Sequence, residues 1–155
     1  MRGFLLVFYI VLCQAVGVVG ARFTAPEIPA WYRTLGKPSF IPPPWVFGPA
    51  WTVLYLLMAT AAWRVTLAPP SDLRAASLFL FAVQLALNLL WSWIFFRCHA
   101  LRAAFAELLL LWLAIATTTF FFARIDSLAG WLMCPYLAWT AFAGVINCSL
   151  LRLNK

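Results

Sequence analysis

Indole, phenol and amide side chains recur at helical spacing in three apolar stretches of this sequence. Residues three or four positions apart lie on one face of a helix. Aromatic rings offer stacking surfaces and amides offer directed hydrogen bonds, which together suit a flat, mostly apolar ligand. The alternative is ordinary helix packing, with the amides forming interhelical hydrogen bonds. The three faces comprise Trp51, Tyr55, Met58 and Ala62; Gln84, Asn88, Trp91 and Phe95; and Pro135, Trp139, Ala143 and Asn147.

The composition indicates that the helices carrying these faces cross a membrane. The chain has 155 residues, of which 66% are hydrophobic, and only four are Asp or Glu. The sequence predicts an all-α membrane protein, a five-transmembrane-helix bundle forming a single domain (1–155), with a long ordered loop between helices 1 and 2. For the first stretch, a cleaved secretory signal is the alternative. The apolar stretches cover residues 3–21, 46–67, 75–96, 103–123 and 127–150.

Amide groups inside a membrane are costly unless they meet partners in the interior of the bundle. We therefore expect Gln84, Asn88 and Asn147 to point inward, together with the aromatic residues on the same faces. In the first stretch, Gln14, Gly17 and Ala21 form a face of small and polar residues, which would allow a neighbouring helix to approach closely.

Residues 22–45 form an unusually long connection between the first two stretches, which we call the lid loop. Its prolines restrict the backbone, and its aromatic side chains are too apolar to be left in water. The pattern predicts a stiff, aromatic cover over one end of the bundle, and the alternative is an aromatic belt at the lipid headgroups. The residues concerned are Pro26, Pro29, Pro38, Pro42, Pro43 and Pro44, with Trp31, Tyr32, Phe40 and Trp45.

The net charge of +7 comes from single cations at the ends of the apolar stretches, a distribution that does not favour nucleic acid. Under the positive-inside rule, the side with more Lys and Arg is cytoplasmic. The C-terminus and the first loop are therefore predicted to be cytoplasmic, whereas the sequence does not say which membrane houses the chain. One side carries Arg2, Arg64, Arg74 and Arg124, and the other carries Arg22, Arg33, Lys37, Arg97, Arg102, Arg152 and Lys155.

The sequence offers no pattern typical of a metal site or a conventional enzyme. Its single histidine, His99, is expected to be solvated at the interface, and the four cysteines form no C-x-x-C pair. Glu107 lies inside an apolar stretch, and we expect it to pair with Arg102 or to extend toward the interface beside it. No acid–base pair or nucleophile triad is visible.

Four segments resemble the signature of the TspO/MBR family, the tryptophan-rich sensory proteins that include the mitochondrial translocator protein. The resemblance covers nearly the whole chain. It implies a five-helix bundle, often a homodimer, with a pocket closed by the first loop. The segments are WYRTLGKPSFIPPPWVFGPAWTVLYLLM (31–58), QLALNLLWSWIFF (84–96), PYLAWTAFAGVIN (135–147) and RLN (152–154).

The resemblance also implies the ligands and their contacts. Family members bind protoporphyrin IX, haem and synthetic isoquinoline and benzodiazepine ligands, without an intrinsic cofactor. Animal members bind cholesterol as well, but this chain lacks the Tyr that precedes a basic residue in their C-terminal pattern. Arg33 and Lys37 could meet porphyrin carboxylates, or serve only as positive-inside anchors. The implied ligand contacts are Trp31, Tyr32, Trp51, Tyr55, Asn88, Trp91, Trp139 and Ala143.

Three functions follow as hypotheses. The first is a tetrapyrrole-binding membrane sensor or regulator linked to oxidative or light stress. The second is light-dependent porphyrin degradation, reported for some family members, with Trp51 and Trp139 as the candidate reactive residues. The third is a porphyrin or sterol transporter, although the sequence lacks the inverted repeats and broken helices of secondary transporters.

Overall fold

The computed structural model describes residues 2–154. Five helices, with α4 and η1 forming one of them, are long and apolar enough to cross a membrane. The predicted all-α fold with five transmembrane helices is confirmed, and the chain is a multi-pass integral membrane protein. The elements are α1 (Arg2–Thr24), α2 (Trp31–Thr34), α3 (Pro44–Leu67), α4 (Asp72–Ser92), the π-helix η1 (Trp93–Arg97), α5 (Leu101–Ile125) and α6 (Ser127–Leu153).

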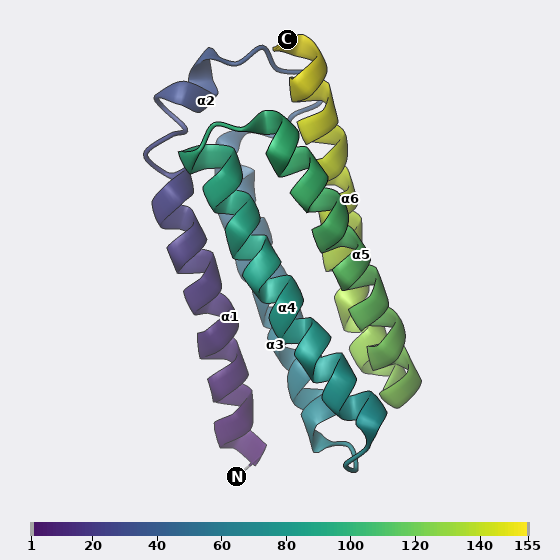
Figure 1. Cartoon of the computed structure of the whole chain (residues 1–155). Helices are drawn as coiled ribbons and strands as arrows, with labels where there is room; N and C mark the ends of the chain where they lie inside the picture. The colour runs from purple at the N-terminus through teal and green to yellow at the C-terminus, as the bar shows by residue number, and fades with distance from the viewer. Residues whose placement is uncertain (1, 155) are drawn as a thin grey trace.

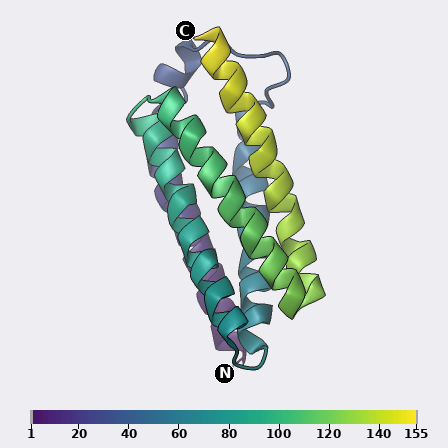
Figure 2. The same cartoon turned by 45° about the vertical axis from the view of Figure 1, so that its right-hand side comes forward.

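The contacts between the five long helices close into a ring, and Figures 1 and 2 show these helices running along one another. α1 packs against α3 and α4, α3 packs against α6, and α5 lies between α4 and α6. The short connections after α3, η1 and α5 force neighbouring helices to run in opposite directions. The two termini therefore lie at opposite ends of the bundle, and the lid loop with α2 covers the end at which α6 finishes.

Polar contacts fix the chain at the end opposite the lid loop. The carboxylate of Asp126 accepts hydrogen bonds from Arg64 Nε (3.1 Å) and Nη2 (2.7 Å), and from the backbone N–H of Ala129 (2.9 Å) at the start of α6. The Arg64 guanidinium holds the pKa of Asp126 below its usual range. At the start of α4, the hydroxyl of Ser71 accepts a hydrogen bond from the backbone N–H of Arg74.

Glycine allows α1 to pack closely against α3. A Cβ atom at Gly17 would lie 2.6 Å from Cε2 of Tyr55, so only glycine leaves room for that ring. Gln14 on the same helix donates a hydrogen bond to the backbone carbonyl of Thr52 (3.1 Å). The close approach expected at Gly17 is thus confirmed, whereas Ala21 is exposed.

We predict that Gly17→Ala lowers the stability of the bundle in detergent. The added methyl group must displace the Tyr55 ring, and overpacking of this kind costs about 1–3 kcal/mol. Gly48→Ala is the matched control, because a Cβ at that helical position meets nothing within 4 Å. Thermal unfolding followed by circular dichroism compares the two variants, and equal midpoints would contradict the proposed steric role of Gly17.

Candidate functional site

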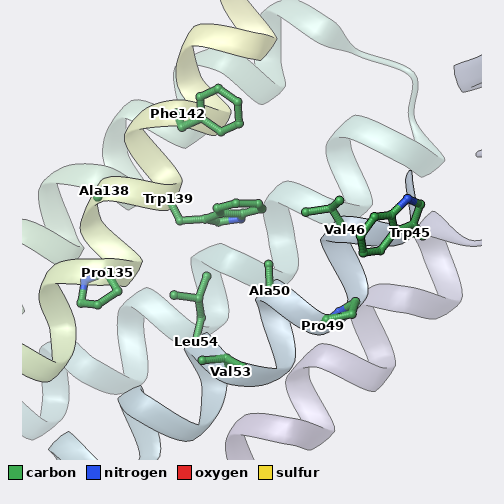
Figure 3. Close-up of a pocket in the computed structure, with 10 residues that line it drawn as sticks. All are labelled: Trp45, Val46, Pro49, Ala50, Val53, Leu54, Pro135, Ala138, Trp139 and Phe142. Carbon is green, nitrogen blue, oxygen red and sulfur yellow. The ribbon is translucent and has the colours of Figure 1, made fainter. Parts of the chain in front are cut away.

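An apolar groove of about 610 Å³ lies between α3 and α6. Two of its residues are prolines inside helices, Pro49 in α3 and Pro135 in α6. Proline removes one backbone hydrogen bond and crowds the carbonyl four residues earlier, so both walls contain a weak point in their helical hydrogen bonding. In Figure 3 the Trp139 ring extends from α6 toward α3. The lining residues are Trp45, Val46, Pro49, Ala50, Val53, Leu54, Pro135, Ala138, Trp139 and Phe142.

A buried chain of hydrogen bonds joins three helices inside the ring. Tyr55 of α3 donates its hydroxyl to Oδ1 of Asn88 on α4 (2.6 Å), and Nδ2 of Asn88 donates to the hydroxyl of Tyr136 on α6 (3.1 Å). The Trp51 ring lies against both tyrosines, with centroid distances of 5.5 Å to Tyr55 and 6.0 Å to Tyr136. These bonds satisfy polar groups that membrane burial would otherwise leave costly.

A second aromatic cluster lies beneath the lid loop. Trp31 of α2 packs edge-on against Phe95 (5.7 Å), and Tyr32 packs against Phe95 and Phe96. Both phenylalanines belong to the π-helix η1 and are buried. Trp91 stacks on Phe95 at 5.0 Å and continues the cluster into α4. Burial raises the pKa of the Tyr32 hydroxyl.

The lid loop is fastened at two places. Nε2 of His99 lies 2.9 Å from Oε2 of Glu27, and the imidazole stacks on Trp31 with a centroid distance of 4.1 Å. Further along the loop, the backbone N–H of Gly36 donates to Oδ1 of Asn154 (2.8 Å), and Nδ2 of Asn154 donates back to the Gly36 carbonyl (2.9 Å). His99 is exposed, as expected, but it is held by the loop rather than only solvated.

The eight implied ligand contacts fall into three neighbouring places. Three belong to the cluster beneath the lid loop (Trp31, Tyr32 and Trp91) and three to the hydrogen-bonded interior (Trp51, Tyr55 and Asn88). Trp139 lines the groove, and the partly buried Ala143 follows Phe142, another groove residue. The structure therefore places Trp139 and Ala143 at or beside the groove, whereas the other six residues pack within the two neighbouring clusters.

Arg33 and Lys37, the two lid-loop cations considered for porphyrin carboxylates, differ in how freely they could meet a ligand. Nζ of Lys37 donates to the backbone carbonyls of Arg33 (3.2 Å) and Leu35 (3.1 Å), and it lies 4.8 Å from the centroid of the Tyr32 ring. Arg33 is exposed on α2. Of the two cations, Arg33 is the less engaged.

Sequence reasoning missed Tyr136, which is fully buried and completes the chain through Asn88. Tyr136 lies seven residues, or two helical turns, before Ala143, and it therefore continues the face formed by Ala143 and Asn147. That spacing was a signal from which Tyr136 could have been predicted. The sequence predicts Trp45 in the lid loop, but in the structure Trp45 belongs to the first turn of α3, which begins at Pro44, and it lines the groove. Ligand pockets in helix bundles lie between helices, and spacing alone does not reveal which two helices will flank the pocket.

Several amides point inward as expected, and one carboxyl group behaves differently from the prediction. Gln84, Asn88 and Asn147 are all buried, with exposures of 0%, 4% and 1%. The expected association of Glu107 with Arg102 at the interface is wrong, because Glu107 is only 7% exposed and Arg102 is exposed without bonding to it. Glu107 lies at helical spacing from the buried residues Ala104 and Leu111 of α5, so it sits on the inward face of that helix.

Together the fold and the site define a class of molecule, a five-helix membrane protein with a tryptophan-lined groove beside a fastened lid loop. The sequence profile of the TspO/MBR family matches residues 9–153. Protein CrtK of Rhodobacter capsulatus is 43% identical over 147 residues, covering 94% of this chain and 90% of that protein. The chain belongs to the TspO/MBR family.

Two further relatives extend the similarity beyond that bacterium. The tryptophan-rich protein TspO of Chlorobaculum tepidum is 41% identical over 145 residues, which cover 92% of this chain and 91% of the relative. The human translocator protein is 40% identical over 138 residues, which cover 88% of this chain and 82% of the relative. The similarity therefore spans bacterial and animal members at nearly full length.

We predict that Asn88→Leu destabilises the bundle more than Tyr136→Phe does. The first change leaves two buried hydroxyl groups without their partner, and each such group costs about 1–3 kcal/mol. Tyr136→Phe removes one hydroxyl group and leaves only the Nδ2 donor of Asn88 without its partner. Thermal unfolding in detergent gives the order, with Thr117→Val on the exposed face of α5 as the control. A larger loss for Tyr136→Phe would contradict the central role of Asn88.

Proposed function

We propose that this protein is a membrane sensor or regulator that binds a tetrapyrrole and is linked to oxidative or light stress. The same site would take isoquinoline- and benzodiazepine-type ligands. Membership of the TspO/MBR family supports the proposal, and the groove between α3 and α6 is the observation that carries it. Its volume of about 610 Å³ is within the range of small-molecule sites.

The side chains of the groove suit a flat, apolar ring. Trp45, Trp139 and Phe142 supply aromatic surfaces, and the remaining lining residues are aliphatic or proline. Aromatic rings gain from offset-stacked or edge contacts with such a ligand. No lining residue is a His, Cys, Met or Tyr, the usual protein ligands of haem iron. The groove would therefore not distinguish metal-free protoporphyrin IX from haem by ligation of iron, and it would hold either molecule by its ring.

The carboxylates of a porphyrin need a cationic or wet end. The lid loop runs beside the groove, because its Phe40 packs against Phe142 at a centroid distance of 6.4 Å. Arg33 is exposed on α2, and its guanidinium could reach a carboxylate at the membrane surface. Lys37 would have to give up its two carbonyl acceptors to do the same.

Light-dependent porphyrin degradation is the alternative function. Trp51 and Trp139 are electron-rich indoles, and Trp51 lies against the rings of Tyr55 and Tyr136. An excited porphyrin touching these groups could accept one electron from an indole, and the resulting pair of radicals would react with oxygen, so the degradation would depend on oxygen as well as light. A porphyrin or sterol transporter ranks third, because α3 and α6 each continue through their internal proline as one helix.

We predict that Trp139→Phe weakens binding of protoporphyrin IX to the purified protein. The smaller ring loses part of its stacking surface, and aromatic contacts contribute about 0.5–1.5 kcal/mol, or about two- to tenfold in Kd. Titration in lipid nanodiscs, followed by porphyrin fluorescence, measures the change. Trp51→Phe tests the inner indole in the same way.

Trp131→Phe is the matched control, because Trp131 is 73% exposed and does not line the groove. Unaltered affinity in both Trp139→Phe and Trp51→Phe would count against the proposed site. Illumination of the complex separates the two functions. Porphyrin bleaching at the same rate with and without protein would reject the degradation hypothesis.

A further inference from the structure

The lid loop is attached to the bundle by directed polar contacts. Asn154 forms two hydrogen bonds with the backbone of Gly36, of 2.8 and 2.9 Å. At the other fastening, His99 contacts Glu27 at 2.9 Å and stacks on Trp31. Lifting the loop would break these contacts and would carry the rings of α2 away from Phe95 and Phe96, toward water. Such an opening is costly, because it exposes both polar and aromatic groups.

The contact between α3 and α6 along the groove, which we call the α3–α6 seam, is apolar where the attachment of the lid loop is polar. Within residues 2–154, the groove itself is lined by apolar side chains, and no direct hydrogen bond crosses it between α3 and α6. The polar ties between these helices lie elsewhere, at Arg64 and Asp126 at the end opposite the lid loop and through Asn88 in the interior. Inside a bilayer, lipid tails are as apolar as the side chains of the groove, so separating the two helices there has no hydrophobic cost. The prolines in the two walls, Pro49 and Pro135, further reduce the backbone hydrogen bonding that resists bending.

The rim of the groove faces the bilayer. Trp45 is 74% exposed and Val53 is 54% exposed, and Pro49, Pro135 and Ala138 are exposed as well. The inner wall is less accessible: Leu54 is only 6% exposed and Trp139 is partly buried. Figure 3 shows the rim residue Trp45 and the inner residue Trp139 on opposite helices. A molecule moving within the membrane therefore meets the rim before it meets Trp139.

We infer that the α3–α6 seam is the port through which the ligand reaches its site, directly from the bilayer and beneath a lid loop that stays closed. The inference rests on the proposed function, and it narrows the ligand class to flat, apolar molecules that partition into the membrane before binding. In this arrangement the lid loop closes the bundle against water, and widening of the seam controls the rate of binding.

The first arm of the test locks the lid loop. A Cβ at Gly36 lies 3.6 Å from Cβ of Leu153, a separation that suits a disulfide. Gly36→Cys with Leu153→Cys, in a chain whose four native cysteines are replaced by alanine, gives an oxidised and a reduced form of one protein. Stopped-flow fluorescence in nanodiscs then measures the association rate of protoporphyrin IX. The rate is expected to be the same in both forms.

The second arm narrows the port. Ala138→Trp places a large side chain on the rim, and Ala141→Trp makes the same change at an exposed position of α6 outside the groove. Association and dissociation should both slow by about tenfold or more in Ala138→Trp and remain unchanged in Ala141→Trp. Val53→Trp and its control Leu56→Trp repeat the comparison on α3 in case the first variant does not fold.

The outcomes separate the inference from the proposed function. Slower association in the oxidised lid form, or unchanged rates in both rim variants, would overturn the port while leaving porphyrin binding intact. The port would also be overturned if a rim variant lowered the affinity without slowing association or dissociation, because the new side chain would then only occupy part of the binding site. Absence of binding by the unmodified protein would reject the proposed function, and the port with it.

Discussion

The structure depends on one buried amide that finds partners within the protein, Asn88, whereas the buried amides of Gln84 and Asn147 have none among the described residues. Water cannot satisfy polar groups inside a membrane, and lipid tails offer nothing in exchange. Asn88 accepts from Tyr55 and donates to Tyr136, and in doing so it ties α3, α4 and α6 together. The ring of helices thus has a directed connection at its centre, where apolar packing alone would leave the relative positions of the helices weakly specified.

Glycine and proline act in opposite ways around that centre. Gly17 removes a side chain where α1 meets Tyr55, which allows a close contact and fixes the ring that donates to Asn88. Pro49 and Pro135 weaken the helices where α3 meets α6, and the groove lies there. The same bundle is therefore tight on one side of α3 and loose on the other. The hydrogen bonds from Tyr55 through Asn88 to Tyr136 hold α3 and α6 together inside the bundle, and the groove lies on the outer side of that connection.

The lid loop connects the ends of several elements. Asn154 holds it to the end of α6, and His99 holds it to the turn between η1 and α5. Proline-rich backbone loses little further entropy when it is fastened in this way. Its Phe40 also touches Phe142, so the loop contacts the wall of the groove as well as the end of the bundle. If Phe142 moved, its contact with Phe40 would transmit the movement to the lid loop.

The sequence by itself determined the five membrane helices, the inward orientation of Asn88 and Asn147 and a face of small residues at Gly17, because span length, the cost of buried amides and side-chain size are local properties. That Tyr55 is the ring for which position 17 must be glycine was decided by the tertiary structure. The tertiary structure decided which groups meet. Helical spacing assigns a residue to a face but does not name the helix opposite, so Tyr136 as the partner of Asn88 and the interior position of Glu107 were not predictable. The groove likewise arises where two proline-containing helices pack side by side. That adjacency is set by the closure of the whole ring, since α3 and α6 are far apart along the chain.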